Sequence, residues 1–181
     1  MLKPDVLVSL SGGIDSTSCL WQLLRDGRTV LVHHIRLRNR EGREEYEHAA
    51  VESILDWLRG QGLDQFVYHE TGFDYGTLPH LTKDVYIVGF VAGLVLMQYP
   101  TVRQVVQSGS ADDAARSPRV PDVTARRKLL METMAGRELE WIRPNWEKSK
   151  AQEMAEMPRD LLELCWYCRR PNGDDPCHKC H

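Results

Sequence analysis

The sequence has little net charge and no long hydrophobic run. Its formal charge is −3 at pH 7, so we expect no overall attraction to nucleic acid or to an anionic membrane. The longest apolar stretch runs from Tyr86 to Met97, which is too short to cross a bilayer and predicts a buried helix. No internal repeat or low-complexity tract is evident, and a hydrophobic content of 42% is enough for one compact core.

We also expect no secretory signal. Met1 leads almost at once into Lys3, Pro4 and the first apolar run, which leaves no room for a signal peptide. Cysteines are scarce except in residues 165–181, where four of the five lie. In a chain without a signal, that concentration favours metal binding over disulfides. We therefore expect a cytoplasmic protein.

Short apolar runs alternate with helix-like segments along most of the chain. This order predicts an α/β fold with a doubly wound, mainly parallel five-stranded sheet. The strands are expected at 5–10, 29–35, 65–69, 103–108 and 139–142. The helices are expected at 15–25, 44–59, 82–98, 121–135, 149–156 and 159–164. Residues 1–164 should form one domain, with residues 165–181 as its cysteine-rich tail.

A glycine-rich turn follows the first predicted strand and opens the first predicted helix. It reads Leu10-Ser11-Gly12-Gly13-Ile14-Asp15-Ser16-Thr17. Such a turn points backbone N–H groups and the positive end of the helix dipole at one place, where phosphate can bind. Asp15 stands where a cap or a metal-facing carboxylate would. No Gly-Lys-Ser/Thr follows, so the turn is not a Walker-type loop. An ordinary strand–turn–helix corner remains the alternative.

Other polar groups follow the later predicted strands. Four arginines lie in residues 36–43 and could bind phosphate or form a solvated loop. Asp112 and Asp113 come after Gly109 and could bind Mg²⁺, contact a substrate or cap the next helix. Three histidines and one cysteine on predicted strands and helices are expected to be structural or to line the cleft: Cys19, His33, His34 and His69.

The tail contains two C-x-x-C pairs separated by eight residues, Cys165/Cys168 and Cys177/Cys180. Four thiolates at this spacing favour a structural zinc site, or failing that an iron–sulfur cluster. Unliganded thiols are the alternative. His178 and His181 are spare candidate ligands.

Ser11-Gly12-Gly13-x-Asp15-Ser16 resembles the pyrophosphate-binding loop of the PP-loop ATPases, which cleave ATP between the α- and β-phosphates. The resemblance implies an adenine nucleotide alpha hydrolase-like fold, ATP and Mg²⁺ as cofactors, and Asp15 and Ser16 as catalytic residues. It also implies that ATP is bound by the segment Leu10, Ser11, Gly12, Gly13, Ile14, Asp15, Ser16, Thr17, Ser18, Cys19 and Leu20.

The loop and the tail together resemble the 7-cyano-7-deazaguanine synthases of queuosine-precursor biosynthesis. That resemblance implies a C–N ligase that adenylates 7-carboxy-7-deazaguanine, admits ammonia and yields 7-cyano-7-deazaguanine (preQ0). It implies Asp112, Asp113 and Lys83 as substrate contacts, zinc on Cys165, Cys168, Cys177 and Cys180, and allows a homodimer.

Two features depart from that family. Its further cysteine after Cys180 is missing, so the fourth zinc ligand is expected to be Cys165 or a histidine such as His181. Its Gly-Arg-Asn stretch is replaced here by residues 81–84. Two other functions therefore stay open. One is another PP-loop enzyme such as a tRNA-modifying sulfurtransferase, and the other is a catalytically silent nucleotide- and zinc-binding partner.

Overall fold

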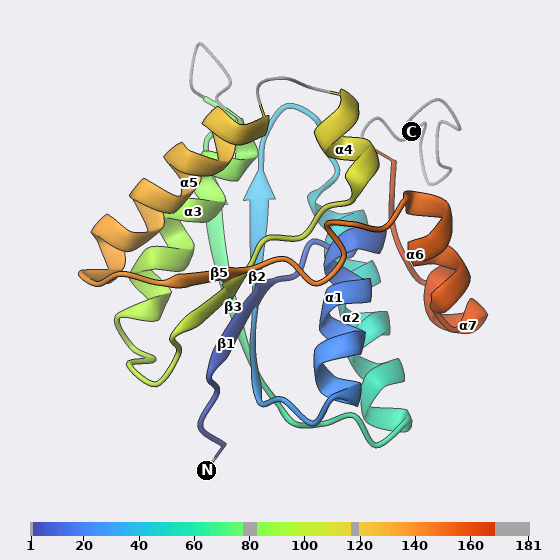
Figure 1. Cartoon of the computed structure of the whole chain (residues 1–181). Coiled ribbons are helices and arrows are strands. Elements are labelled where there is room, and N and C mark those ends of the chain that lie inside the picture. Colours follow the sequence, from blue (N-terminus) through green and yellow to red (C-terminus); the bar gives the residue numbers. More distant parts are fainter. Residues whose placement is uncertain (1, 78–82, 117–119, 169–181) are drawn as a thin grey trace.

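The computed structural model describes residues 2–77, 83–116 and 120–168. Within them, five parallel strands form one sheet in the order β3-β2-β1-β4-β5 (Figure 1). The strands are β1 (Val6–Ser9), β2 (Val30–Arg38), β3 (Phe66–Asp74), β4 (Gln104–Val106) and β5 (Glu140–Ile142). The predicted doubly wound α/β fold and all five of its strands are confirmed.

Helices cover both faces of the sheet (Figure 1). On one face lie α1 (Ile14–Arg25), α2 (Glu44–Gly60), α6 (Lys150–Glu156) and α7 (Arg159–Glu163). On the other face lie α3 (Asp84–Leu96) and α5 (Val120–Ala135), and the short α4 (Ala111–Arg116) follows β4. The chain leaves β1 toward β2 and later returns to the opposite side of β1 as β4. A crevice therefore opens between the carboxyl ends of β1 and β4, where ligands bind in sheets of this kind.

Alternation along the central strand explains why both faces are apolar. Val6 and Val8 pack in the core cluster that includes α1 and α2, whereas Leu7 packs with residues of α3 and α5. Successive side chains of a strand point to opposite faces, so a strand buried on both sides is apolar throughout.

Two strands are longer than predicted. β2 continues to Arg38 and β3 to Asp74, and the pairs from His34↔Glu70 to Arg38↔Asp74 extend the parallel ladder. From the sequence, Gly72, Gly76 and Pro79 predict a loop over residues 70–81, directly after the third strand. Backbone pairing to β2 overrides that local preference.

The sequence pattern of α2 predicts that Ala49, Ile54, Leu55 and Leu58 point inward, and the last three of these are buried. Ala49 is exposed, whereas Ala50 and Val51 are buried beside Ile54. The buried stripe follows the 3.6-residue period from the well-placed Ile54 and Leu58.

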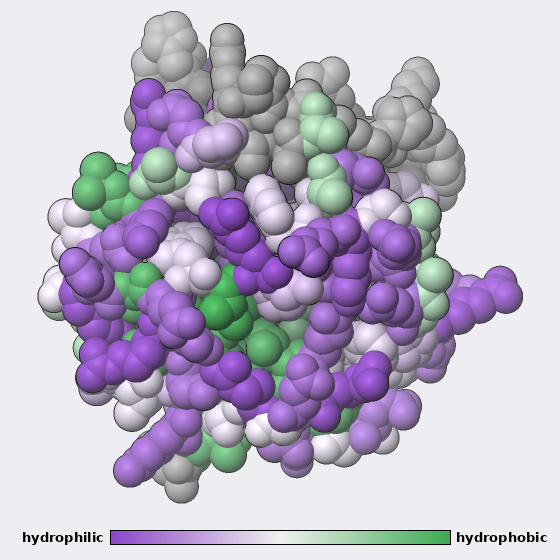
Figure 2. Space-filling view, in the orientation of Figure 1, coloured by the Kyte–Doolittle hydropathy of each residue, from purple (hydrophilic) through white to green (hydrophobic). Residues whose placement is uncertain are grey.

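Two glycines bring α3 and α5 close together. A Cβ at Gly89 would lie 3.0 Å from the Arg127 carbonyl oxygen, and one at Gly93 would lie 2.6 Å from that of Met131. Of the described helices, none has both the length and the apolar character needed to cross a membrane. The face in Figure 2 is mostly hydrophilic, with a small hydrophobic area near its middle.

Candidate functional site

The glycine-rich turn joins β1 to α1 and is pressed against α2. Gly12 has a φ of 77°, a conformation that suits glycine. A Cβ there would lie 3.0 Å from both Ala50 Cβ and the Glu47 carbonyl oxygen. The Gly12 carbonyl oxygen also accepts a hydrogen bond of 2.8 Å from the Trp166 amide. The turn is therefore fixed from two sides, by α2 and by the segment after α7.

The two serines of the turn hold its shape. Ser16 Oγ donates to the Gly13 carbonyl at 3.2 Å and lies 3.3 Å from both Ser11 N and Ser11 Oγ. Gly13 is the N-cap residue of α1 and has no side chain to cap this end, and its own amide donates to Ser11 Oγ at 3.4 Å. The first-turn amides and the positive end of the helix dipole are left for an anion.

Asp15 forms an ion pair with Lys150, the first residue of α6. Lys150 also lies 3.4 Å from Glu153 Oε2, and its amide donates to Asp112 Oδ2 at 2.8 Å. Sequence reasoning assigned no role to Lys150. The contact joins residues 135 positions apart, and only the fold brings them together. Asp112 therefore uses one carboxylate oxygen to support the start of α6.

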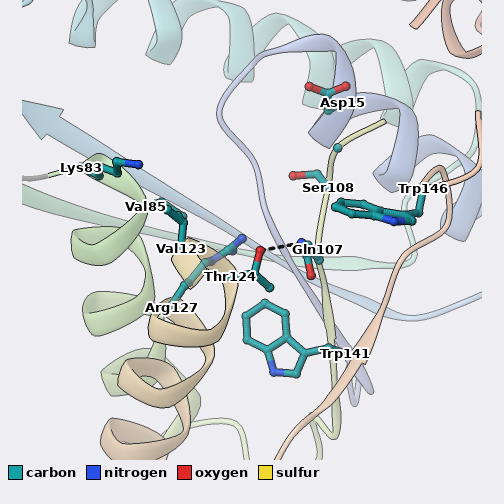
Figure 3. A pocket seen from close by; sticks show the side chains of 11 residues that line it. Asp15, Lys83, Val85, Gln107, Ser108, Val123, Thr124, Arg127, Trp141 and Trp146 are labelled. Carbon is teal, nitrogen blue, oxygen red and sulfur yellow. Dashed lines mark hydrogen bonds between the residues drawn. The ribbon is translucent and has the colours of Figure 1, made fainter. Parts of the chain in front are cut away.

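Two neighbouring cavities open at the carboxyl edge of the sheet, and we call them the β4 cavity and the β1 cavity. The β4 cavity, of about 260 Å³, is shown in Figure 3. Its walls come from the turn, the segment after β4, β5 with the segment that follows it, and the starts of α3 and α5: Asp15, Lys83, Val85, Gln107, Ser108, Gly109, Val123, Thr124, Arg127, Trp141 and Trp146.

The β1 cavity, of about 330 Å³, lies over the ends of β1 and β2. It is lined by Ser9, Leu10, Ser11, His33, Ile35, Leu37, Arg43, Glu47, Asp84, Val85, Val88, Ser108 and Arg127. The predicted substrate contact Lys83 thus reaches a cavity, as do Leu10, Ser11 and Asp15 of the predicted ATP segment. The side chains of Thr17, Ser18, Cys19 and Leu20 are buried.

Arg127 lines both cavities and was given no role from the sequence. Arg127 is only 9% exposed. Its Nε has no hydrogen-bond partner among the described residues, and its Nη2 donates to Ser9 Oγ at 3.4 Å. Burial lowers its pKa to about 10. The sequence did hold a signal, because Val123, Arg127, Met131 and Ala135 recur every four residues on one helix face.

The arginines of residues 36–43 are engaged with the protein. Arg36 pairs with Glu44 and Glu45, and Arg43 pairs with Glu41, Glu47 and Asp84. Arg38 lies 3.6 Å from Glu44, and Arg40 donates to the Gly76 carbonyl. Their acidic neighbours favour a structural role over phosphate binding.

The described thiols and two of the histidines are buried, as expected of structural groups. Burial raises the pKa of Cys19 to about 12 and that of Cys165 to about 11. Burial lowers the pKa of His33 to about 3 and also lowers that of His34, whose Nδ1 lies 2.9 Å from the Leu10 carbonyl oxygen. The expected roles of Cys19, His33 and His34 agree with these positions.

Part of the predicted metal and substrate set lies outside the described residues. Cys165 and Cys168 are buried, and Cys165 Sγ lies 3.6 Å from the Leu161 carbonyl oxygen. Cys177, Cys180, His178 and His181 fall beyond residue 168, and the Asp113 side chain is also outside the described set. The zinc site stays a prediction.

Comparison with known proteins identifies a similar fold. No protein-family model matches the sequence, and no curated protein does. The structure is similar to that of the NMN synthetase from Francisella tularensis, with a TM-score of 0.52 and 14% identity. The match covers 90% of this chain and 65% of the synthetase chain. At this identity the likeness shows a shared fold, a parallel α/β sheet of the same architecture.

Proposed function

We propose that this chain is an ATP-dependent ligase that forms AMP and pyrophosphate. The observation that carries the proposal is the Ser11-Gly12-Gly13 turn, which lies at the uncapped start of α1 beside the crevice between β1 and β4. Backbone amides and a helix dipole aimed at one place suit a pyrophosphate group. A fold shared with a protein named as a synthetase supports the proposal.

In the proposed reaction, an oxygen of the acid's carboxylate forms a bond to the α-phosphorus of ATP. The bond from that phosphorus to the bridging α–β oxygen breaks, and its electron pair leaves with pyrophosphate. Amides of the turn stabilise this developing charge, with Asp15 beside them, and the Ser16 hydroxyl would join them by exchanging its hydrogen bond to the Gly13 carbonyl for one to pyrophosphate. Ammonia then attacks the acyl carbon, AMP departs with the carboxylate oxygen, and the nitrogen loses a proton to solvent.

The proposed acid is 7-carboxy-7-deazaguanine, and a second ATP would serve to dehydrate the amide to the nitrile of preQ0. Lys83, which lines the β4 cavity, and the aspartates Asp112 and Asp113 are the proposed substrate contacts. The chemistry needs no thiol nucleophile. The buried thiol of Cys19, whose pKa is raised to about 12, therefore fits it better than it fits sulfur transfer.

Two metal ions belong to the proposal. Asp15 is the one carboxylate among the described residues that line the β4 cavity, and a single carboxylate with the ATP phosphates suits Mg²⁺. It would exchange its Lys150 partner for the ion. Zinc would be held by Cys165, Cys168, Cys177 and Cys180 as a structural ion. Cys165 fits that role after its thiol loses the proton that now faces the Leu161 carbonyl.

The test is to measure AMP and pyrophosphate release from ATP with and without 7-carboxy-7-deazaguanine and ammonium. We expect release to depend on the acid, and we expect Ser16→Ala to lower kcat about tenfold or more because one charge-stabilising donor is lost. ATP binding with no acid-stimulated AMP release would favour a nucleotide-binding partner over a ligase and would contradict the proposal.

A further inference from the structure

An uncompensated positive charge lies at the junction of the two cavities. Among the described residues, no carboxylate pairs with Arg127, and burial alone accounts for its lowered pKa. A buried charge without an ionic partner is strongly unfavourable, so proteins rarely keep one unless a ligand completes it. The site is therefore built for an anion that the protein does not supply.

The position of Arg127 is fixed by packing. A Cβ at Gly89 of α3 would lie 3.1 Å from Arg127 Cγ, so the glycine leaves room for the arginine stem. The guanidinium carbon lies 5.3 Å from the centre of the Trp141 ring. In Figure 3 the side chain runs from α5 toward the middle of the pocket. The guanidinium is held between an aromatic ring and the end of β1.

The surroundings of Arg127 favour the carboxylate of an aromatic acid over a phosphate as its partner. The first-turn amides of α1 already offer a phosphate site at the turn. The β4 cavity beside Arg127 has an apolar and aromatic wall formed by Val85, Val123, Trp141 and Trp146. Aromatic side chains stack on planar rings, and the guanidinium fork matches a carboxylate in geometry.

We propose that Arg127 binds the carboxylate of a planar aromatic acid whose ring occupies the β4 cavity. This proposal rests on the ligase function above and deepens it by naming the carboxylate-binding residue. The contact of Arg127 with Ser9, the last residue of β1 and directly before the turn, brings that carboxylate next to the phosphate-binding amides. The acid and the α-phosphate then meet where adenylation requires them.

The test compares acids with the same rings lacking the carboxylate. Calorimetry would measure the binding of 7-carboxy-7-deazaguanine and 7-deazaguanine, of indole-3-carboxylate and indole, and of ATP, each to the full chain. The variants are Arg127→Met and the matched control Arg126→Met, which removes an exposed arginine from the preceding position of the same helix.

We expect Arg127→Met to weaken binding of at least one acid tenfold or more, while its carboxylate-free ring and ATP bind within about twofold of the unmodified chain. Arg126→Met should change none of these affinities. The melting temperature of Arg127→Met should equal or exceed that of the unmodified chain, because an unpaired buried charge is removed. If Arg127 only stabilised the fold, its replacement would instead lower the melting temperature.

Three results would overturn the inference: unchanged acid binding in Arg127→Met, a loss of ATP binding without a loss of acid binding, or an unmodified chain that binds neither acid more tightly than its ring. The second result would make Arg127 a phosphate contact. If indole-3-carboxylate binds through Arg127 but 7-carboxy-7-deazaguanine does not, this inference stands and the proposed substrate fails.

Discussion

At the scale of single residues, the site depends on one backbone position and on two cations that only the fold brings to it. Gly12 combines a positive φ with direct contact to α2, so both its conformation and its missing side chain matter. The motif around Gly12 could be read from the sequence. Lys150 could not, because its contact with Asp15 joins residues 135 positions apart. For Arg127 the four-residue pattern marks the helix face, but not the contact with Ser9, which lies 118 residues away in the chain.

Replacing Gly12 by alanine should weaken nucleotide binding at least tenfold. The new Cβ would clash with Ala50 and the Glu47 carbonyl, and the turn would move away from the start of α1. Gly27→Ala is the matched control, because Gly27 has a similar φ of 75° and no atom within 4 Å of the added Cβ. Both variants should lose about 1 kcal/mol of stability from backbone strain.

In ATP titrations followed by calorimetry, Gly12→Ala should bind ATP at least tenfold more weakly, and Gly27→Ala should bind it as the unmodified chain does. Equal ATP affinity in the two variants would show that the turn does not hold the nucleotide.

The stability of the protein should fall as the pH drops below about 6.5. The pKa of His33 is about 3 in the folded state, so between pH 6.5 and 3 the unfolded chain binds more protons. The free energy of unfolding should then decrease by up to about 1.4 kcal/mol per pH unit from this residue.

Urea denaturation at pH 7.5, 6.0 and 5.0 measures that slope. His33→Gln should have a smaller slope than the unmodified chain, because its side chain does not titrate. An identical slope in both proteins would mean that His33 is not buried in the neutral form.

At the scale of elements, the local sequence pattern located every strand but missed the carboxyl-terminal extensions of β2 and β3. β2 and β3 continue past their apolar stretches because each supplies backbone partners to the other. The packing of α3 on α5 has a cause within the sequence, because the two helices approach closely at glycines in a hydrophobic run. Glycines spaced four apart were readable from the sequence, whereas the partner helix was not.

Adding a methyl group between α3 and α5 should destabilise the fold. A Cβ at Gly93 would lie 2.6 Å from the Met131 carbonyl oxygen and 2.6 Å from Met134 Cβ, so the helices must separate. We expect Gly93→Ala to lower the free energy of unfolding by about 2 kcal/mol.

Gly60→Ala, in the last turn of α2, is the control because the added Cβ meets no atom within 4 Å. It should raise stability by about 0.5 kcal/mol through helix propensity. Urea denaturation of the two variants should therefore give changes of opposite sign. A stabilised Gly93→Ala would contradict the close packing of α3 on α5.

At the scale of the whole molecule, the sheet order decides where chemistry can occur. Strands β1 and β4 are neighbours, although residues 10–103 separate them in the chain. That adjacency puts the turn after β1 beside Gln107 and Ser108 after β4. Alternating strands and helices predicted the fold class, and the glycine turn predicted one half of the candidate site. The half contributed by α5 and β5 required the three-dimensional arrangement.

The central claim is that this protein joins a carboxylate to the α-phosphate of ATP. The most direct measurement uses 7-carboxy-7-deazaguanine labelled with ¹⁸O in its carboxylate, with ATP and ammonium, and determines the mass of the products. Adenylation predicts AMP that carries one ¹⁸O atom from the acid. Unlabelled AMP, or ¹⁸O in phosphate together with ADP, would contradict the account.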